Sequence, residues 1–108
     1  MHLPAPVQKN NDVADIAAAQ SPHTPLAALA ELAAVGSSRY RNLIVENPAA
    51  TDALVLDILD SHLAEDDLLL HALRNPAIGL FLFDRLAKRV PAHLGWIVDS
   101  LRLRRFGP

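Results

Sequence analysis

Cysteine is missing from this chain of 108 residues, and long uncharged apolar runs are missing as well. Without cysteine the protein has no disulfide, no thiolate zinc site and no cysteine nucleophile. No apolar run approaches the roughly 20 residues that a membrane-spanning helix needs. The N-terminal residues MHLPAPVQKNND also lack the basic segment and apolar stretch that are typical of a signal peptide. We therefore expect a cytoplasmic protein without a membrane partner.

Aromatic side chains are also scarce, whereas alanine and leucine, two strong helix formers, are abundant. Apolar residues recur at helical spacing along most of the chain, and no stretch alternates for long enough to predict a strand. The sequence therefore predicts an all-α protein with one domain over residues 11–106. Residues 1–10 contain two prolines and no periodicity, and we expect them to form a flexible arm.

Proline residues divide the chain at similar intervals. Pro22, Pro48 and Pro76 are separated by 26 and 28 residues. Apolar residues stand in matching positions of the intervals: Leu29, Val55 and Phe83; Leu32, Ile58 and Leu86; Ala33, Leu59 and Ala87; Tyr40, Leu68 and Trp96; Val45, Leu73 and Leu101. This agreement predicts a right-handed α-solenoid of about three units, in which long and short helices alternate. The alternative is a bundle of four or five helices with proline in its loops.

Polar residues beside these breaks predict where helices begin. Asn11 or Asp12 is a suitable N-cap for the first helix, and Thr51 is suitable for a helix that follows the second break. Thr24 is the expected N-cap of a helix whose first residue is Pro25, because proline is favoured in the first helical turn.

Two segments resemble the variant leucine-rich repeat, a family of bacterial α-solenoid proteins: AAAQSPHTPLAALAELA at residues 17–33 and SRYRNLIVENPAAT at residues 38–51. The third break keeps Asn75-Pro76 but lacks the Thr-Pro of the first. The resemblance implies that α-helices alternate with shorter, often 3₁₀, helices, and the family has no common enzymatic activity. Some members carry a cysteine-ligated iron–sulfur cluster, which this chain cannot hold because it has no cysteine.

Residues that could support catalysis or metal binding are few and poorly spaced. Two histidines flank three acids at one turn, without the spacing of a ligand pair on one helix: His62, Glu65, Asp66, Asp67 and His71. Asp57 and Asp60 share a helix face, as the residues of a solvated polar face also do. The four glycines are scattered, so no phosphate-binding loop is present in the sequence. We predict a protein that is not an enzyme and that needs no metal or cofactor.

Charge is unevenly distributed along the chain although the formal net charge is only −2. Residues 42–73 contain seven acidic and no Lys or Arg side chains, whereas residues 85–108 contain six Lys or Arg side chains and one acid. Aromatic residues also gather toward the C-terminal end. We predict a partner-binding surface formed by Phe81, Arg85, Lys88, Arg89, Trp96, Arg102, Arg104 and Arg105.

This surface supports two functional hypotheses. The first is a scaffold that binds a protein partner, for which the acidic middle of a second copy of this chain is one candidate. The second is contact with a nucleic-acid backbone through the C-terminal arginines. The isoelectric point near 6.2 favours the protein partner, because dedicated nucleic-acid binders are usually basic.

Overall fold

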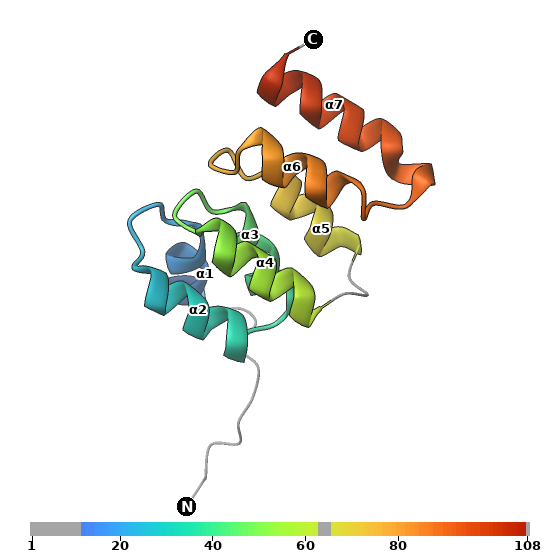
Figure 1. Ribbon diagram of the computed structural model, residues 1–108. Coiled ribbons are helices and arrows are strands. Elements are labelled where there is room, and N and C mark those ends of the chain that lie inside the picture. The colour runs from blue at the N-terminus through green and yellow to red at the C-terminus, as the bar shows by residue number, and fades with distance from the viewer. Residues whose placement is uncertain (1–11, 63–65, 108) are drawn as a thin grey trace, which may run out of the picture.

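The computed structural model describes residues 12–62 and 66–107, which form seven α-helices and one 3₁₀ turn (Figure 1). The elements are α1 (Val13–Gln20), α2 (Leu26–Val35), α3 (Ser38–Glu46), α4 (Asp52–Ser61), α5 (Asp66–Leu73), α6 (Leu80–Ala87), η1 (Ala92–Leu94) and α7 (Gly95–Phe106). Within the described ranges no strand is formed, so the all-α prediction is confirmed. The arm predicted over residues 1–10 lies outside the described residues. Of the helices just named, none is long and apolar enough to cross a bilayer.

The helices lie in two rows. In the first row, α1 contacts α3, α3 contacts α5, and α5 contacts α7. The helices α2, α4 and α6 lie in front of α1, α3 and α5 in Figure 1. α3 is the central element, because it contacts α1, α2, α4 and α5.

Two of the predicted helix starts are confirmed and one is wrong. The Asp12 carboxylate accepts hydrogen bonds from the backbone N–H of Ala14 and Asp15, and the Thr51 hydroxyl accepts one from Leu54. Thr24 does not cap α2, because its hydroxyl donates to the carbonyl of Ala18 at 2.5 Å. The last carbonyls of a helix have no partner within it, so Thr24 closes the end of α1 rather than the start of α2.

Most of the predicted matching positions are buried. Leu29, Val55 and Phe83 are each 0% exposed, and the remaining buried members fill the same core: Leu32, Ala33, Tyr40, Val45, Ile58, Leu59, Leu68, Leu73 and Leu86. Trp96 is 69% exposed, so the prediction that it occupies a buried position equivalent to those of Tyr40 and Leu68 is wrong. The break at Pro91 is followed by η1, and α7 then buries Val98 instead.

Gly36 is needed where α2 turns into α3. A Cβ atom at this position would lie 2.6 Å from the carbonyl oxygen of Leu32 and 2.6 Å from Cδ2 of Tyr40. Tyr40 is fully buried, and its hydroxyl accepts a hydrogen bond from the backbone N–H of Asp12 at 3.1 Å. The ring therefore cannot move aside without losing packing and its contact with the start of α1.

The two Asn-Pro breaks are joined to the preceding break by asparagine side chains. The Asn47 amide donates to the carbonyls of Ala19 and Ser21, each at 2.8 Å, and its oxygen accepts from the N–H of Ala49. The Asn75 amide repeats this pattern one step later. It donates to the carbonyls of Val45 and Asn47, and its oxygen accepts from the N–H of Ala77.

These two asparagines are almost completely buried, with 2% of Asn47 and 0% of Asn75 exposed. A buried amide is tolerated when its donors and its acceptor are satisfied, as they are here. Ser21 forms the first member of the series, since its hydroxyl accepts from the N–H of His23 at 3.2 Å. The Pro-containing breaks therefore act as joints between neighbouring pairs of helices.

Candidate binding surfaces

The predicted partner-binding residues all lie on α6, on α7 and on the segment that joins them. These two helices run in opposite directions across the C-terminal end of the molecule (Figure 1). An edge-to-face contact between Phe83 and Phe106, with ring centroids 5.3 Å apart, holds them together. The surface is therefore built mainly on two helices, with Lys88 and Arg89 on the segment between them.

Arg105 forms a similar joint at the C-terminal end of the molecule. Its guanidinium donates to the carbonyls of Asn75, Pro76 and Ile78 at 2.6–2.9 Å and lies over the ring of Phe106. The carbonyl of Asn75 occupies the place that the carbonyl of Asn47 has in the preceding joint. Arg105 thus replaces asparagine at this end of the molecule, and its donors are used within the fold.

Arg102 and Arg89 are also engaged within the chain. Arg102 forms an ion pair with Asp84 of α6 and lies over the ring of Phe83, with its guanidinium carbon 5.1 Å from the centroid. Arg89 forms a longer, exposed ion pair with Asp60 of α4 at 3.3 Å. Three of the six cationic side chains that were predicted to bind a partner therefore make contacts within the chain.

The other three cations, Arg85, Lys88 and Arg104, are exposed. Within residues 12–62 and 66–107 they form no ion pair. Arg85 and Lys88 lie on the outer side of α6 and just beyond it, whereas Arg104 lies in the last turn of α7. The structure thus leaves positive charge available on both C-terminal helices.

Two large aromatic side chains are exposed on the same helices. Phe81 is 84% exposed and Trp96 is 69% exposed, whereas Phe83 is completely buried. Each exposed ring lies in the first turn of its own helix, and the helices are antiparallel (Figure 1). The two rings therefore lie toward opposite ends of the α6–α7 pair and do not form one contiguous cluster.

A cleft of about 400 Å³ lies between α6 and α7 beside the turn at Pro91. Its polar lining consists of Asp84, Lys88, Asp99 and Arg102, and its apolar lining includes Val90 and Val98. Asp84 is already paired with Arg102. This mixture of charges and aliphatic groups can receive a side chain of a partner.

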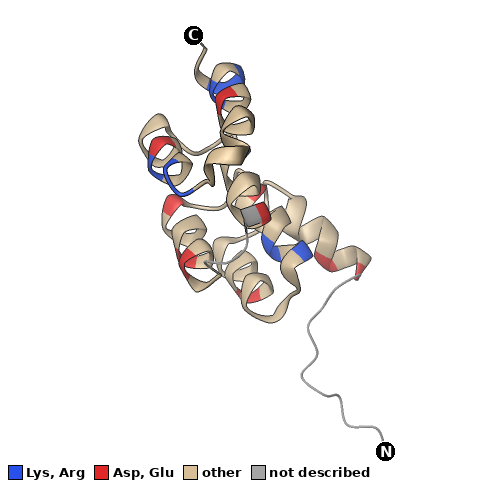
Figure 2. Cartoon of the chain, turned by 90° about the vertical axis from the view of Figure 1, so that its right-hand side faces the viewer, with Lys and Arg blue, Asp and Glu red and all other residues tan. Residues whose placement is uncertain are grey.

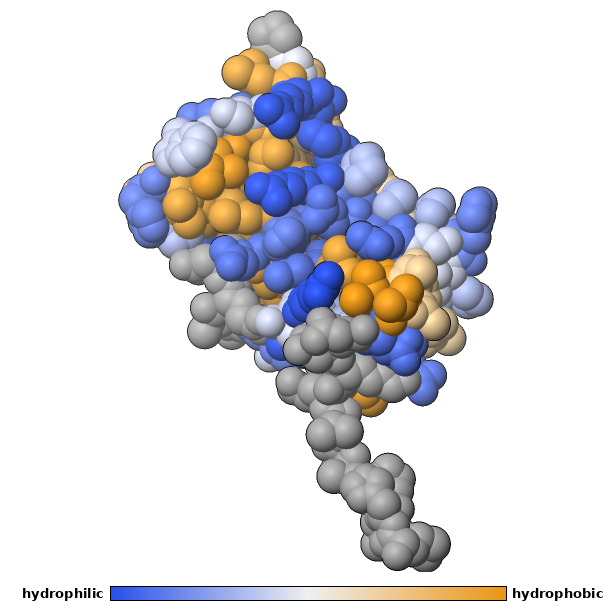
Figure 3. Space-filling view, turned by 180° about the vertical axis from the view of Figure 1, so that it is seen from behind, coloured by the Kyte–Doolittle hydropathy of each residue, from blue (hydrophilic) through white to orange (hydrophobic). Residues whose placement is uncertain are grey.

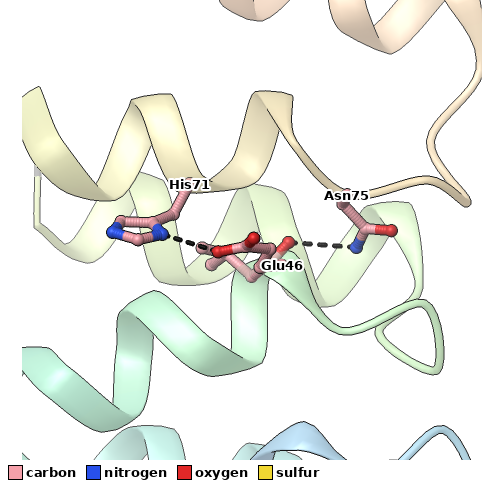
Figure 4. Close-up of polar contacts among 4 residues, drawn as sticks. Glu46, His71 and Asn75 are labelled. Carbon is pink, nitrogen blue, oxygen red and sulfur yellow. Dashed lines mark hydrogen bonds and ion pairs between the residues drawn. The ribbon is translucent and has the colours of Figure 1, made fainter. Parts of the chain in front are cut away.

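No metal site was predicted from the histidines and acids of residues 62–71. His71 lies on α5 and contacts Glu46 of α3, with 2.6 Å between Nδ1 and the carboxylate, beside the Asn75 joint (Figure 4). Glu65 lies outside the described residues. In the described part of the chain, no three His, Asp or Glu side chains are close enough to hold one metal ion. The contact between Glu46 and His71 therefore connects α3 to α5.

Charge is segregated in space as well as along the chain. Figure 2 shows red segments on α4 and blue segments on α6 and on the turn that follows it. From behind, apolar side chains gather in two separate patches with hydrophilic residues between them (Figure 3). Among the described residues of that face, the apolar side chains form no continuous surface of the kind that marks a large obligate interface.

Comparison of the chain with protein-family models, with curated proteins and with solved structures gives no match. The assignment of a function therefore depends on the geometry described above.

Sequence reasoning missed the role of two kinds of residue. The Asn-Pro breaks were interpreted as boundaries between repeat units, but no role was assigned to the asparagine side chains, although their spacing of 28 residues is the signal for equivalent joints. Arg105 was assigned to a binding surface because it belongs to the basic C-terminal cluster, whereas its carbonyl acceptors lie 27 to 30 residues earlier in the chain. No local pattern shows such a contact.

Proposed function

We propose that the chain is a non-enzymatic module that binds a protein partner through its C-terminal helices. In this proposal the helix pairs are about three units of a right-handed solenoid of the variant leucine-rich-repeat type. The equivalent contacts of Asn47 and Asn75 support a repeated unit, because each amide reaches the preceding break in the same manner. Helical-repeat proteins commonly bind partners on extended helix surfaces.

The exposure of Phe81 and Trp96 is the observation that carries this proposal. Large aromatic residues are enriched among the side chains that supply most of the binding free energy at protein interfaces. Both rings lie on helices whose other aromatic residues are packed, so their exposure is not the result of a loose core. A partner that covers them gains apolar burial without requiring the module to rearrange.

The alternative is contact with a nucleic acid through the C-terminal cations. The electrostatic part of phosphate binding depends on Lys and Arg side chains whose charge is not already paired. Arg89 and Arg102 face carboxylates, and Arg105 donates to three carbonyls. Only Arg85, Lys88 and Arg104 remain from the predicted set, and this favours a protein partner.

Affinity capture with matched variants tests the proposal. The immobilised chain is compared with an F81A/W96A variant and with a V13A/L26A variant, whose altered residues are also exposed but lie on α1 and α2. Candidate partners from a nuclease-treated extract are then purified and titrated by calorimetry. We expect F81A/W96A to weaken the dissociation constant about tenfold or more, and V13A/L26A to leave it within about twofold. Equal affinity of all three chains would contradict the proposal.

Fluorescence anisotropy of labelled DNA and RNA tests the alternative. The informative variant is R85E/K88E/R104E, because these three cations have no role in the joints described above. We expect no salt-dependent binding by the unaltered chain at about 50 mM salt, where backbone contacts are strong. Binding that weakens steeply with salt and disappears in the variant would place a nucleic acid ahead of a protein partner.

A further inference from the structure

The outer faces of α4 and α6 are equivalent in position and opposite in charge. The offset of 28 residues between Asn47 and Asn75 also relates α4, which begins at Asp52, to α6, which begins at Leu80. This offset aligns three exposed residues at the outer face of one helix with three at that of the other: Ala53 with Phe81, Asp57 with Arg85, and Asp60 with Lys88. Within each set the spacings of four and seven place the side chains on one face of the helix.

We propose that a second copy of this chain binds this face, so that α4 of each copy packs against α6 of the other. The inference rests on the proposed function as a protein-binding module and names its partner. Charge complementarity is the main argument, because the acidic set on α4 has the same spacing as the basic set on α6. Figure 2 shows acidic segments on α4 and basic segments on and just after α6 at one side of the molecule.

Symmetry selects one arrangement of the two copies. α4 and α6 run in the same direction (Figure 1). One possible two-fold axis is parallel to the helices, lies between the two copies and is level with the middle of the α4–α6 pair. Rotation about this axis leaves the helix direction unchanged and places α4 opposite the partner's α6. A two-fold axis across the helices would instead bring the acids of α4 against the same acids of the partner. Like charges in register are destabilising, so the first arrangement is favoured.

The first arrangement also matches side-chain size. It places Phe81 opposite the partner's Ala53, where a small residue leaves space for an aromatic ring. It places Asp57 opposite the partner's Arg85 and Asp60 opposite the partner's Lys88. Asp60 also pairs with Arg89 of its own chain, but its side chain is 67% exposed and can accept a second cation. Burial of Phe81 supplies apolar contact, and the charges set the register of the two copies.

Sedimentation equilibrium of the full chain measures the association directly. We expect a reversible dimer at about 50 mM salt and a dissociation constant about tenfold higher at about 500 mM, because screening weakens exposed charge pairs. F81A is expected to raise the dissociation constant about tenfold at both salt concentrations. A monomer at every concentration up to the solubility limit would overturn the inference.

Charge reversal gives the sharpest test. The variant D57K/D60K has basic residues on both helices, and the variant R85E/K88E has acidic residues on both. Each alone should be monomeric, because both copies of the contact become repulsive. An equimolar mixture should form a one-to-one heterodimer, because both copies of the contact are then attractive. A mixture that remains monomeric, with both variants folded by circular dichroism, contradicts the proposed arrangement.

A matched control carries charge changes outside this face. D99K/R104E alters two exposed residues of α7 and should associate like the unaltered chain. Loss of the dimer in this control would overturn the α4–α6 contact. A monomeric chain that still captures another protein through Phe81 and Trp96 overturns the self-association but leaves the proposed function. A dimer whose F81A/W96A form captures the same external partners unchanged overturns the external-partner proposal but leaves the dimer.

Discussion

The joint at Asn75 and the joint at Arg105 use different chemical groups for the same task. Asn75 is completely buried, and its neutral amide satisfies two carbonyls and one N–H. Arg105 is only partly buried, and its charged group satisfies three carbonyls and accepts nothing. A charge inside the molecule would lose its hydration without a counter-ion, whereas a charge at the end keeps part of it. Position within the molecule thus decides which side chain can form a joint.

The largest effect is expected at the interior joint. N75A removes the partners of the Val45 and Asn47 carbonyls and of the Ala77 N–H, in a site that water does not reach. We expect the free energy of unfolding to fall by about 3 kcal/mol, measured by urea denaturation followed by circular dichroism. R74A, at the exposed neighbouring residue, should change it by less than about 0.5 kcal/mol. A loss of similar size in both variants would show that the amide does not form a strong joint.

Alanine at Gly36, between α2 and α3, and alanine at Gly95, at the start of α7, should change the free energy of unfolding in opposite directions. G36A places a Cβ atom 2.6 Å from Tyr40 Cδ2, and we expect a loss of about 2 kcal/mol from overpacking. A Cβ atom at Gly95 would meet no atom within 4 Å, and the backbone angles of this residue are helical. We therefore expect G95A to raise the free energy of unfolding by about 0.5 kcal/mol. Thermal and urea denaturation of both variants measure the difference. A gain of stability in G36A would mean that α2 and α3 can separate at little cost.

The terminal joint should be weaker than the interior one. Lysine cannot present the planar set of donors that reaches three carbonyls, so R105K should lose about 1 kcal/mol of the unfolding free energy. The same replacement at the exposed Arg104 serves as the control, with an expected change below about 0.5 kcal/mol. If R105K lowers the free energy of unfolding as much as N75A does, the partly hydrated joint is as strong as the buried one and the comparison is contradicted.

The smallest effect is expected for the ion pair between α6 and α7. R102M keeps much of the aliphatic stem but removes the charge beside Asp84, and we expect a loss of about 0.5 kcal/mol. Because both side chains are more than a third exposed, salt should reduce the difference further. Urea denaturation at low and high salt measures this dependence. A difference that does not change with salt would assign the effect to packing on Phe83 instead.

The sequence predicts the helices and much of the core because both follow from local spacing. Leu29, Val55 and Phe83 were aligned by their distance from proline, and all three are fully buried. Local spacing does not determine contacts between residues that are far apart in the chain. Trp96 was placed by the same spacing, but the 3₁₀ turn after Pro91 changes which side of α7 faces the core.

The candidate surface is predictable only in outline. Composition indicates a cationic and aromatic C-terminal end, and Phe81 and Trp96 are indeed exposed there. Composition cannot show which cations are neutralised, because Arg105 and Asn75 are 30 residues apart and the ion pair of Arg102 spans 18. The offset of 28 between α4 and α6 already follows from the spacing of Pro48 and Pro76, and the asparagine contacts support it as a relation between equivalent positions.

The joints have a further consequence for how the chain folds. The hydrogen bonds of Asn47, Asn75 and Arg105 to preceding breaks span 26 to 30 residues. Each joint therefore closes a loop of nearly the same length, and the entropy lost on closure is similar each time. No joint requires the two ends of the chain to meet. The N-terminal joint can form as soon as Asn47 has left the ribosome, and the later ones can follow in order of synthesis.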